Sequence, residues 1–136
     1  MQLLFERDFP AATESLAVVR AAVGEACRQA GGGEECAEQL VLAVNEACMN
    51  IIQHGYALAP AQQFRLCLMQ DDDMLVVHLL DNGRRAAVAD LRPRELDDLR
   101  PGGLGVRFIR ETTDELAYLP PPAGFTNLLQ LKKRIT

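Results

Sequence analysis

One carboxylate and one carboxamide stand a single helical turn apart near the middle of the chain. Glu46 and Asn50 lie in residues 45–56, which read Asn-Glu-Ala-Cys-Met-Asn-Ile-Ile-Gln-His-Gly-Tyr, and this spacing puts both on one face of a helix. Their oxygen atoms suit a hard cation such as Mg²⁺. The two residues can also have separate roles, with Asn50 holding the cation and Glu46 accepting a proton. Taken alone, a solvated pair on an outer helix face is the more common explanation.

A second candidate is an acidic residue at the end of an apolar run. Asp81 follows Leu80 and precedes Asn82 and Gly83. A carboxylate at the end of a buried strand can accept a hydrogen bond from an exocyclic amine, and Gly83 lets a flat ring approach the backbone. In isolation, an ordinary Asp-Asn-Gly turn explains the segment as well.

Glycines form the third candidate. Residues 100–105 read Arg-Pro-Gly-Gly-Leu-Gly, directly before an expected helix that contains Val106, Phe108 and Ile109. Bare N–H groups at the positive end of a helix bind phosphate. The segment follows a polar loop and lacks the Lys-Ser/Thr pair, so it is neither a Rossmann fingerprint nor a P-loop. A flexible linker explains it equally well when it stands alone.

Hydrophobic periodicity predicts the elements that position these residues. Strands are expected at 3–9, 64–69, 74–80, 115–119 and 125–132. A first helix capped by Thr13 should end at the glycines 31–33, and a second should run from about 34 to 55. The apolar stripe of the second helix is Leu40, Val44, Ala47, Cys48 and Ile51. Residues 84–101 are polar and read as a mobile loop with room for a short helix at 93–99. The order β-α-α-β-β-α-β-β predicts an α+β fold with helices on one face of a mixed sheet.

Composition excludes several classes of protein. The chain has 136 residues and a net charge of −5, which suits one domain over 1–136 without affinity for nucleic acid. No apolar run approaches the ~20 residues of a membrane span, and the N-terminus is charged too early for a signal peptide. Four cysteines match no zinc or redox motif, so we expect small, mostly buried side chains in a reducing cytoplasm. His78 is expected to be a core histidine.

Together, the order and spacing of the three candidates resemble the nucleotide site of the GHKL (Bergerat-type) ATPase superfamily. Glu46, Asn50 and residues 54–56 look like its N-box, residues 81–83 like its first glycine box and residues 103–105 like its second. Residues 84–101 would be the ATP lid. Within the superfamily, the residue pattern of these motifs is most similar to that of the anti-sigma-factor serine kinases. The resemblance covers nearly the whole chain and implies a single-domain Bergerat-type α/β sandwich, with helices on one face of a mixed, mainly antiparallel sheet.

The resemblance also implies a role for each site residue. Asp81 would bind the adenine amine of ATP, Asn50 would coordinate Mg²⁺, and Glu46 would act as general base on a protein serine. The remaining nucleotide contacts would come from Gly83, Arg100, Gly103, Leu104 and Gly105. A third glycine box is at best vestigial in residues 124–126.

The function implied is an anti-sigma factor that is also an ATP-dependent protein-serine kinase. Such a protein phosphorylates an anti-sigma-factor antagonist, binds a sigma factor and usually forms a homodimer. The main alternative is a nucleotide-gated protein-binding module of the same fold without phosphotransfer. The catalytic domain of a sensor histidine kinase is less favoured, because no helix with a phospho-accepting histidine precedes the first strand. A plain scaffold would require three motif coincidences in the right order.

Overall fold

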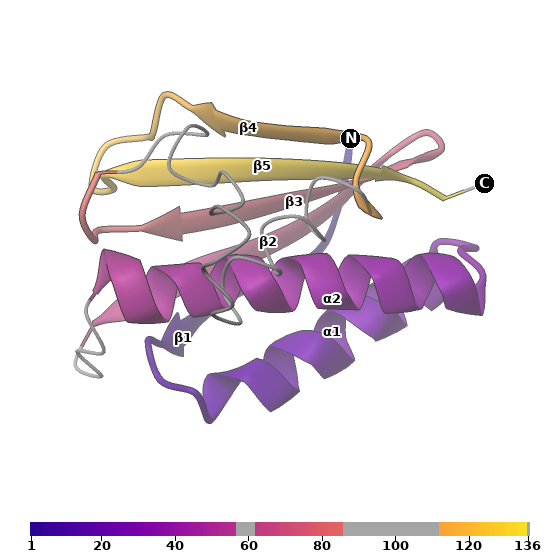
Figure 1. Ribbon diagram of the computed structural model, residues 1–136. Helices are drawn as coiled ribbons and strands as arrows, with labels where there is room; N and C mark the ends of the chain where they lie inside the picture. The colour runs from indigo at the N-terminus through magenta and orange to yellow at the C-terminus, as the bar shows by residue number, and fades with distance from the viewer. Residues whose placement is uncertain (57–61, 86–111, 136) are drawn as a thin grey trace, which may run out of the picture.

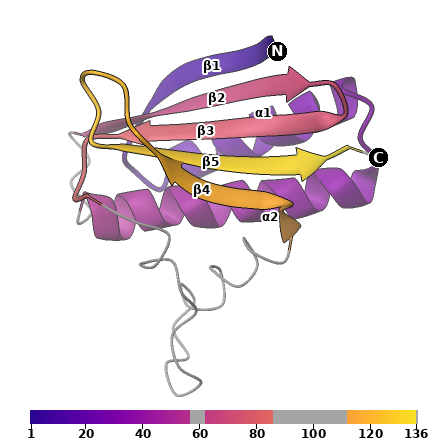
Figure 2. The same cartoon turned by 90° about the horizontal axis from the view of Figure 1, so that it is seen from above.

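Two helices and a five-stranded sheet form two layers. The computed structural model describes residues 1–56, 62–85 and 112–135. In chain order the elements are β1 (Gln2–Pro10), α1 (Ser15–Gln29), α2 (Glu34–Asn50), η1 (Ile51–Gly55), β2 (Gln63–Asp71), β3 (Met74–Asp81), β4 (Glu115–Leu119) and β5 (Asn127–Arg134). The helices cover one face of the sheet (Figures 1 and 2). The predicted α+β fold, with helices on one face of a mainly antiparallel sheet, is confirmed, but the described strands pair only antiparallel and do not form the mixed sheet that was expected.

The sheet brings the ends of three strands to one level. Its strand order is β1-β2-β3-β5-β4, and each of these neighbouring pairs is antiparallel. Asp81, the last residue of β3, stands opposite Phe64 of β2 and Asn127 of β5. The end of β3 is therefore flanked by the beginnings of two other strands, so side chains from distant parts of the sequence meet there.

The core lies between the helices and the sheet. Every residue of the apolar stripe predicted for the second helix is buried. Phe9 of β1 stacks on Phe64 of β2 with ring centroids 5.8 Å apart. Burying a large apolar side chain stabilises the fold by about 1.5–3 kcal/mol. The main contributors are Phe9, Leu16, Val19, Val23, Leu40, Val44, Ile52, Phe64, Leu66, Leu79 and Leu131.

The second helix changes its winding before it ends. It was predicted to reach about residue 55, and helical structure does reach Gly55, but residues Ile51–Gly55 are π-helical. The N–H of Tyr56 donates to the carbonyl of Ile51, 2.9 Å away. Segments of π-helix are rare in proteins, and those that occur often lie at functional sites.

Two predicted boundaries are wrong. Thr13 does not cap the first helix, which begins at Ser15 without any side-chain cap. The hydroxyl of Ser15 instead donates to the carbonyl of Pro10 at 2.8 Å, because the chain turns back on β1 before it enters the helix. The last strand begins at Asn127 and not at residue 125, because Phe125 belongs to a turn in which its N–H donates to Pro122 at 3.2 Å.

His78 is not in the core. Its neighbours Val77 and Leu79 belong to the core cluster, so the alternation of side chains along β3 turns His78 to the sheet face away from the helices. There the ring Nε2 is hydrogen-bonded to Oε1 of Gln130 at 2.9 Å. Helices predicted at 93–99 and after residue 105 lie outside the described residues. Within the described part of the chain, no helix is long and apolar enough to cross a bilayer.

Candidate functional site

One tyrosine hydroxyl joins the end of the helical layer to the end of β3. Tyr56 follows η1 and is 8% exposed. Its hydroxyl donates to the carbonyl of Gln63, which begins β2, at 2.7 Å, and accepts the backbone N–H of Asn82. In Figure 1 the end of α2 and the end of β3 lie at the same end of the molecule. The two candidate segments, residues 45–56 and 81–83, therefore meet at Tyr56 and Asn82.

The Asp81 carboxylate is buried, and one of its oxygens is already bound. Asp81 is 4% exposed. Its Oδ1 accepts the N–H of Gly83 and the side-chain amide of Asn127, each at 2.9 Å. Burial raises the pKa of this carboxyl above its ordinary value, while the hydrogen bonds from Asn127 and Gly83 oppose the rise. No residue in the described ranges binds Oδ2, so Oδ2 is available as an acceptor for a ligand.

Thr126, directly before β5, and Asn127, its first residue, fix the turn that carries Asp81. Besides binding Asp81, the amide of Asn127 donates to the carbonyl of Arg84 at 2.9 Å. The hydroxyl of Thr126 donates to the carbonyl of Gly83 at 2.8 Å, and the Thr126 N–H donates to the carbonyl of Asp81 at 2.9 Å. These bonds hold the turn 81–84 against β5, so the Asp81 carboxylate has a defined orientation.

Asn127 is a site residue that the sequence reasoning missed. The sequence pattern predicts a role for residues 124–126 only as the remnant of a glycine box. The available signal was a polar residue directly before the apolar pair Leu128 and Leu129. A buried asparagine at the start of a core strand needs hydrogen-bond partners, and the end of β3 supplies them.

Asn50 has a buried amide nitrogen without a partner. Of the buried side-chain polar atoms in the described residues, Nδ2 of Asn50 is the one that makes no hydrogen bond. Leaving such a group unpaired costs about 1–3 kcal/mol. A half-turn of the amide exchanges its nitrogen and oxygen and would offer an oxygen ligand instead. Asn50 lies where α2 gives way to η1, so this unmet polar group stands in the predicted site.

These groups fit an Mg²⁺ ion bound together with phosphate. Mg²⁺ usually keeps several waters and takes only one or two protein oxygens beside the substrate phosphates. Asn50 and Glu46 offer oxygens of this kind one turn apart. Among the residues that the structure describes, no three His, Cys, Asp or Glu side chains form a cluster that could hold a metal by themselves. The donor set therefore suits a cation that comes with its substrate.

Glu46 is a half-buried carboxylate on α2. Burial raises its pKa above the ordinary value. A carboxylate with a raised pKa is a stronger base than an ordinary one. Its position one turn before Asn50 therefore suits proton transfer.

Of the five further nucleotide contacts that were predicted, the described residues include one. Gly83 lies in the turn after β3 and binds Asp81 through its N–H. Arg100, Gly103, Leu104 and Gly105 lie outside the described residues, as do residues 86–101 of the expected lid.

Comparisons with known proteins show which family the chain resembles. A family model described as the histidine kinase-like ATPase domain matches residues 9–131. The serine-protein kinase RsbW of Staphylococcus epidermidis is 28% identical over 120 residues, covering 82% of this chain and 76% of RsbW. The serine/threonine-protein kinase BtrW of Bordetella bronchiseptica is 32% identical over 83 residues, or 58% of each chain.

A solved structure shares the fold. The crystal structure of the RsbU and RsbW domains of a Mycobacterium tuberculosis protein superposes with a TM-score of 0.67 over 96% of this chain, at 17% identity. The match spans 31% of that longer chain.

Proposed function

Because this chain belongs to the histidine kinase-like ATPase domain family, we propose that it is an ATP-dependent protein-serine kinase that also acts as an anti-sigma factor. Its substrate is an anti-sigma-factor antagonist. The observation that carries the proposal is the buried Asp81 carboxylate, with Oδ1 held by two donors and Oδ2 left to accept. Relatives named serine-protein kinase support the reaction type.

Asp81 selects adenine. A carboxylate offers only acceptors, so Oδ2 takes a hydrogen from the exocyclic amine of adenine. Guanine carries a carbonyl at the same ring position, which would set two acceptors against each other. A buried polar group left unpaired in this way disfavours the wrong ligand strongly. Asn127 and Gly83 contribute by holding the carboxylate in one orientation.

Asn50 and Glu46 serve the other end of the nucleotide. Asn50 holds Mg²⁺, which neutralises charge on the phosphate oxygens when it is bound. Glu46 accepts the proton of the substrate serine hydroxyl as that hydroxyl attacks phosphorus. The remaining contacts to the nucleotide come from Gly83, Arg100, Gly103, Leu104 and Gly105, with residues 84–101 as the lid of a single ATPase domain, 1–136.

A shift in melting temperature tests nucleotide use. Mg-ATP at about 100 times its dissociation constant adds ~2.7 kcal/mol to the free energy of unfolding. The melting temperature should then rise by several degrees with Mg-ATP and much less with Mg-GTP. No rise with millimolar Mg-ATP, in a folded sample, would refute the nucleotide site. An equal rise with Mg-GTP would refute selection by Asp81.

The alternative function is a nucleotide-gated binding module without phosphotransfer. In both cases we propose a cytoplasmic homodimer that holds a sigma factor in one nucleotide state and the antagonist in another. The half-buried Glu46 favours the kinase, because a module that only binds has no need of a base. Mass spectrometry of a purified antagonist after incubation with the protein and Mg-ATP separates the two. Phosphoserine supports the kinase, and nucleotide-dependent binding without phosphoserine supports the module.

A further inference from the structure

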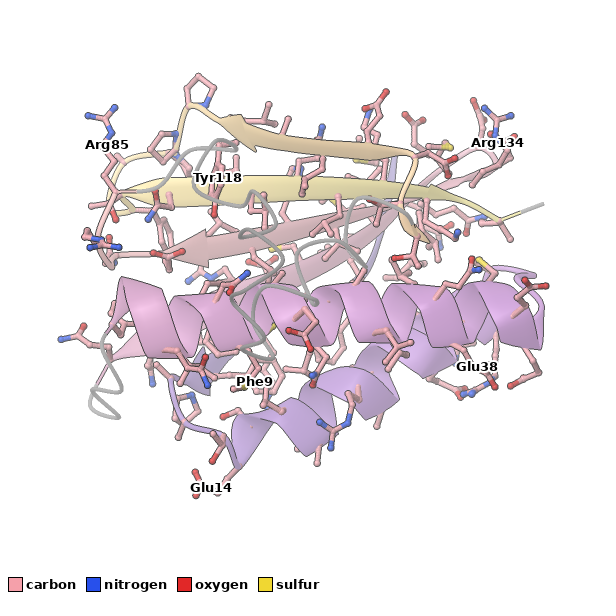
Figure 3. The ribbon with its side chains drawn as sticks, in the orientation of Figure 1. Phe9, Glu14, Glu38, Arg85, Tyr118 and Arg134 are labelled. Carbon is pink, nitrogen blue, oxygen red and sulfur yellow. The ribbon has the colours of Figure 1, made fainter. Side chains whose placement is uncertain are left out.

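Two cysteines meet at the end of the helical layer opposite the nucleotide site. Cys27 lies in the last turn of α1 and Cys36 in the first turn of α2. The connection between these helices lies at the other end of the molecule from the C-terminal end of α2 (Figure 1). The thiol of Cys36 is also 3.6 Å from the carbonyl of Arg134, and Figure 3 shows Arg134 and Arg85 at opposite ends of the sheet.

The two sulfur atoms are in contact. They are 3.5 Å apart, in residues nine positions apart along the chain. A disulfide bond is about 2.05 Å long, so the sulfurs need to approach by roughly 1.5 Å to form one. Closing this gap requires rotation of the two side chains or a small shift of a helix end.

The loop between the helices is shaped around the Cys27 sulfur. The N–H of Gly32 donates to the Cys27 carbonyl at 2.9 Å. A Cβ atom on residue 32 would lie 2.5 Å from the Cys27 sulfur and 3.5 Å from that of Cys36. A side chain at residue 32 would therefore displace the sulfur of Cys27. With glycine there, the loop leaves both thiols in place.

We propose that Cys27 and Cys36 form a reversible dithiol–disulfide site that reacts with low-molecular-weight disulfides. Cys36 is partly exposed and Cys27 is 0% exposed, so Cys36 is the thiol that a reagent reaches first. The proposal does not depend on the nucleotide site or on the proposed kinase activity.

The reaction balances as two exchange steps. The Cys36 thiolate attacks a disulfide RSSR; the bond between the reagent's sulfurs breaks, a Cys36–SR bond forms and RS⁻ leaves. Cys27 then attacks the Cys36 sulfur and its proton passes to the departing group, which leaves as RSH, while the first RS⁻ takes its proton from solvent. The two cysteines are oxidised by two electrons, and RSSR is reduced to two RSH.

The difference in burial determines which of the two cysteines reacts first. Burial and the neighbouring Cys36 raise the pKa of the Cys27 thiol to about 12, against the positive charges of Arg28 and Lys133. Cys27 is therefore protonated at neutral pH in the reduced protein and does not begin the reaction. Once Cys36 carries SR, the sulfur to be attacked already lies beside Cys27.

Oxidised glutathione is the probe, and Cys67 supplies the matched control. Cys67 is a half-buried free cysteine on β2, and burial raises the pKa of its thiol to about 11. In the described part of the chain, the contact between cysteine sulfurs is that of Cys27 with Cys36. After incubation, free thiols are alkylated and the peptides are identified by mass spectrometry. We expect one Cys27–Cys36 disulfide, with the loss of two hydrogens, which dithiothreitol reverses.

Three variants separate the steps. Cys27→Ser should stop at a stable glutathione adduct on Cys36, Cys36→Ser should leave Cys27 unmodified, and Cys67→Ser should behave as wild type. A persistent adduct on Cys36 in the wild type, or reaction at Cys67 in preference to the pair, would overturn the proposal. Circular dichroism of each variant ensures that the comparison is made on folded protein.

Melting temperature gives a second readout. Cross-linking across about ten residues restricts the unfolded chain, so the oxidised protein should melt several degrees above the reduced one. An unchanged or lower melting temperature would mean that the bond displaces the helices, and the claim that the two thiols are already positioned for it would be wrong.

Discussion

The two ends of helix α2 differ in how well their polar groups are satisfied. At the start, Glu34 and Glu35 stand in the first turn, where negative charge is favourable, and Glu34 pairs with Arg28 at 2.9 Å. At the far end, the amide nitrogen of Asn50 is buried without a partner, and Glu46 is half-buried with a raised pKa. The helix then continues as a π-helix.

This difference supports the proposed site at the end of α2. A sequence that served only the fold would satisfy its buried polar groups everywhere, and exceptions concentrate at functional sites. Within the described part of the chain, the buried polar side-chain atom without a hydrogen bond is the Asn50 amide nitrogen, at the end of α2. The middle of the helix is ordinary core, with Leu40 and Val44 almost fully buried. The stability that this packing provides offsets the unfavourable burial of polar groups at the end of the helix.

The largest effect is expected for Glu46→Gln. The amide keeps the shape of the side chain but cannot take a proton, so phosphorylation of the antagonist should slow by about 10²–10⁴-fold. ATP binding should persist, because Asn50 and Asp81 are unchanged. In the wild type the rate should rise with pH through the raised pKa of Glu46, and this rise should be absent from the variant.

Glu38→Gln is the control for that experiment. Glu38 lies two turns earlier on α2 and is exposed (Figure 3). Its substitution should leave the rate close to that of wild type, because Glu38 is exposed and lies away from Glu46 and Asn50. Normal phosphorylation by Glu46→Gln would show that Glu46 is not the base.

Leu40→Ala tests the supporting part of the helix. Leu40 is 1% exposed, so truncating it should lower the free energy of unfolding by about 2–5 kcal/mol. Leu42→Ala is the matched control, because Leu42 is 50% exposed and should cost less than ~0.5 kcal/mol. Denaturant titration measures both. Equal costs at the two positions would contradict the described packing of α2.

Asp81→Asn should separate ligand binding from stability. The amide can turn a donor toward the adenine amine, so ATP should bind more weakly by about 1–3 kcal/mol. Isothermal titration calorimetry with ATP and Mg²⁺ measures this loss. Unchanged affinity would make Asp81 a turn residue only.

The same variant should alter the pH dependence of stability. Because burial raises the pKa of Asp81 in the folded state, the folded protein holds this proton more tightly than the unfolded chain. Stability is therefore lost as pH rises from the ordinary aspartate pKa to the raised folded value, and the penalty persists above it. Asp81→Asn removes that contribution, so at neutral pH it should be no less stable than wild type. A clear destabilisation would mean that the hydrogen bonds to Oδ1 outweigh the cost of burial.

The smallest effect is expected for Asn50→Leu. Removing a buried, unpaired amide should raise the free energy of unfolding by about 1 kcal/mol while it weakens Mg²⁺-dependent ATP binding. Asn45→Leu is the comparison, because the side-chain oxygen of Asn45 accepts a hydrogen bond from Arg20 at 2.9 Å. That substitution should give no gain. If Asn50→Leu were destabilising, the amide would have a structural role.

Local pattern was sufficient to predict most elements and the positions of three candidate site residues on them. Apolar alternation and turn residues placed the strands, and the spacing of Glu46 and Asn50 placed both on α2, where the structure has them. Asp81 was predicted at a strand end and lies at the end of β3. These features depend on neighbours in sequence, which the sequence shows directly.

The features that were missed depend on packing between distant segments. The sheet face of His78 could not be predicted, because β3 is buried on both sides: Val76 on the outer face is as inaccessible as Val77 on the inner one. Asn127 matters only through the register of β5 on β3. The meeting of Cys27 and Cys36 requires the angle between two helices. Each of these is set by three-dimensional packing.

The hydrogen bond between Asp81 and Asn127 bears on the order in which the protein folds. It joins residues 46 positions apart, whereas β2 and β3 form a hairpin around Asp71–Met74. Local contacts form early and distant ones late, because closing a long loop costs more entropy. A nascent chain can therefore build the hairpin that carries Asp81 well before β5 is synthesised. Its carboxylate stays without the Asn127 donor until that strand docks, so nucleotide recognition should be among the last properties that the protein acquires.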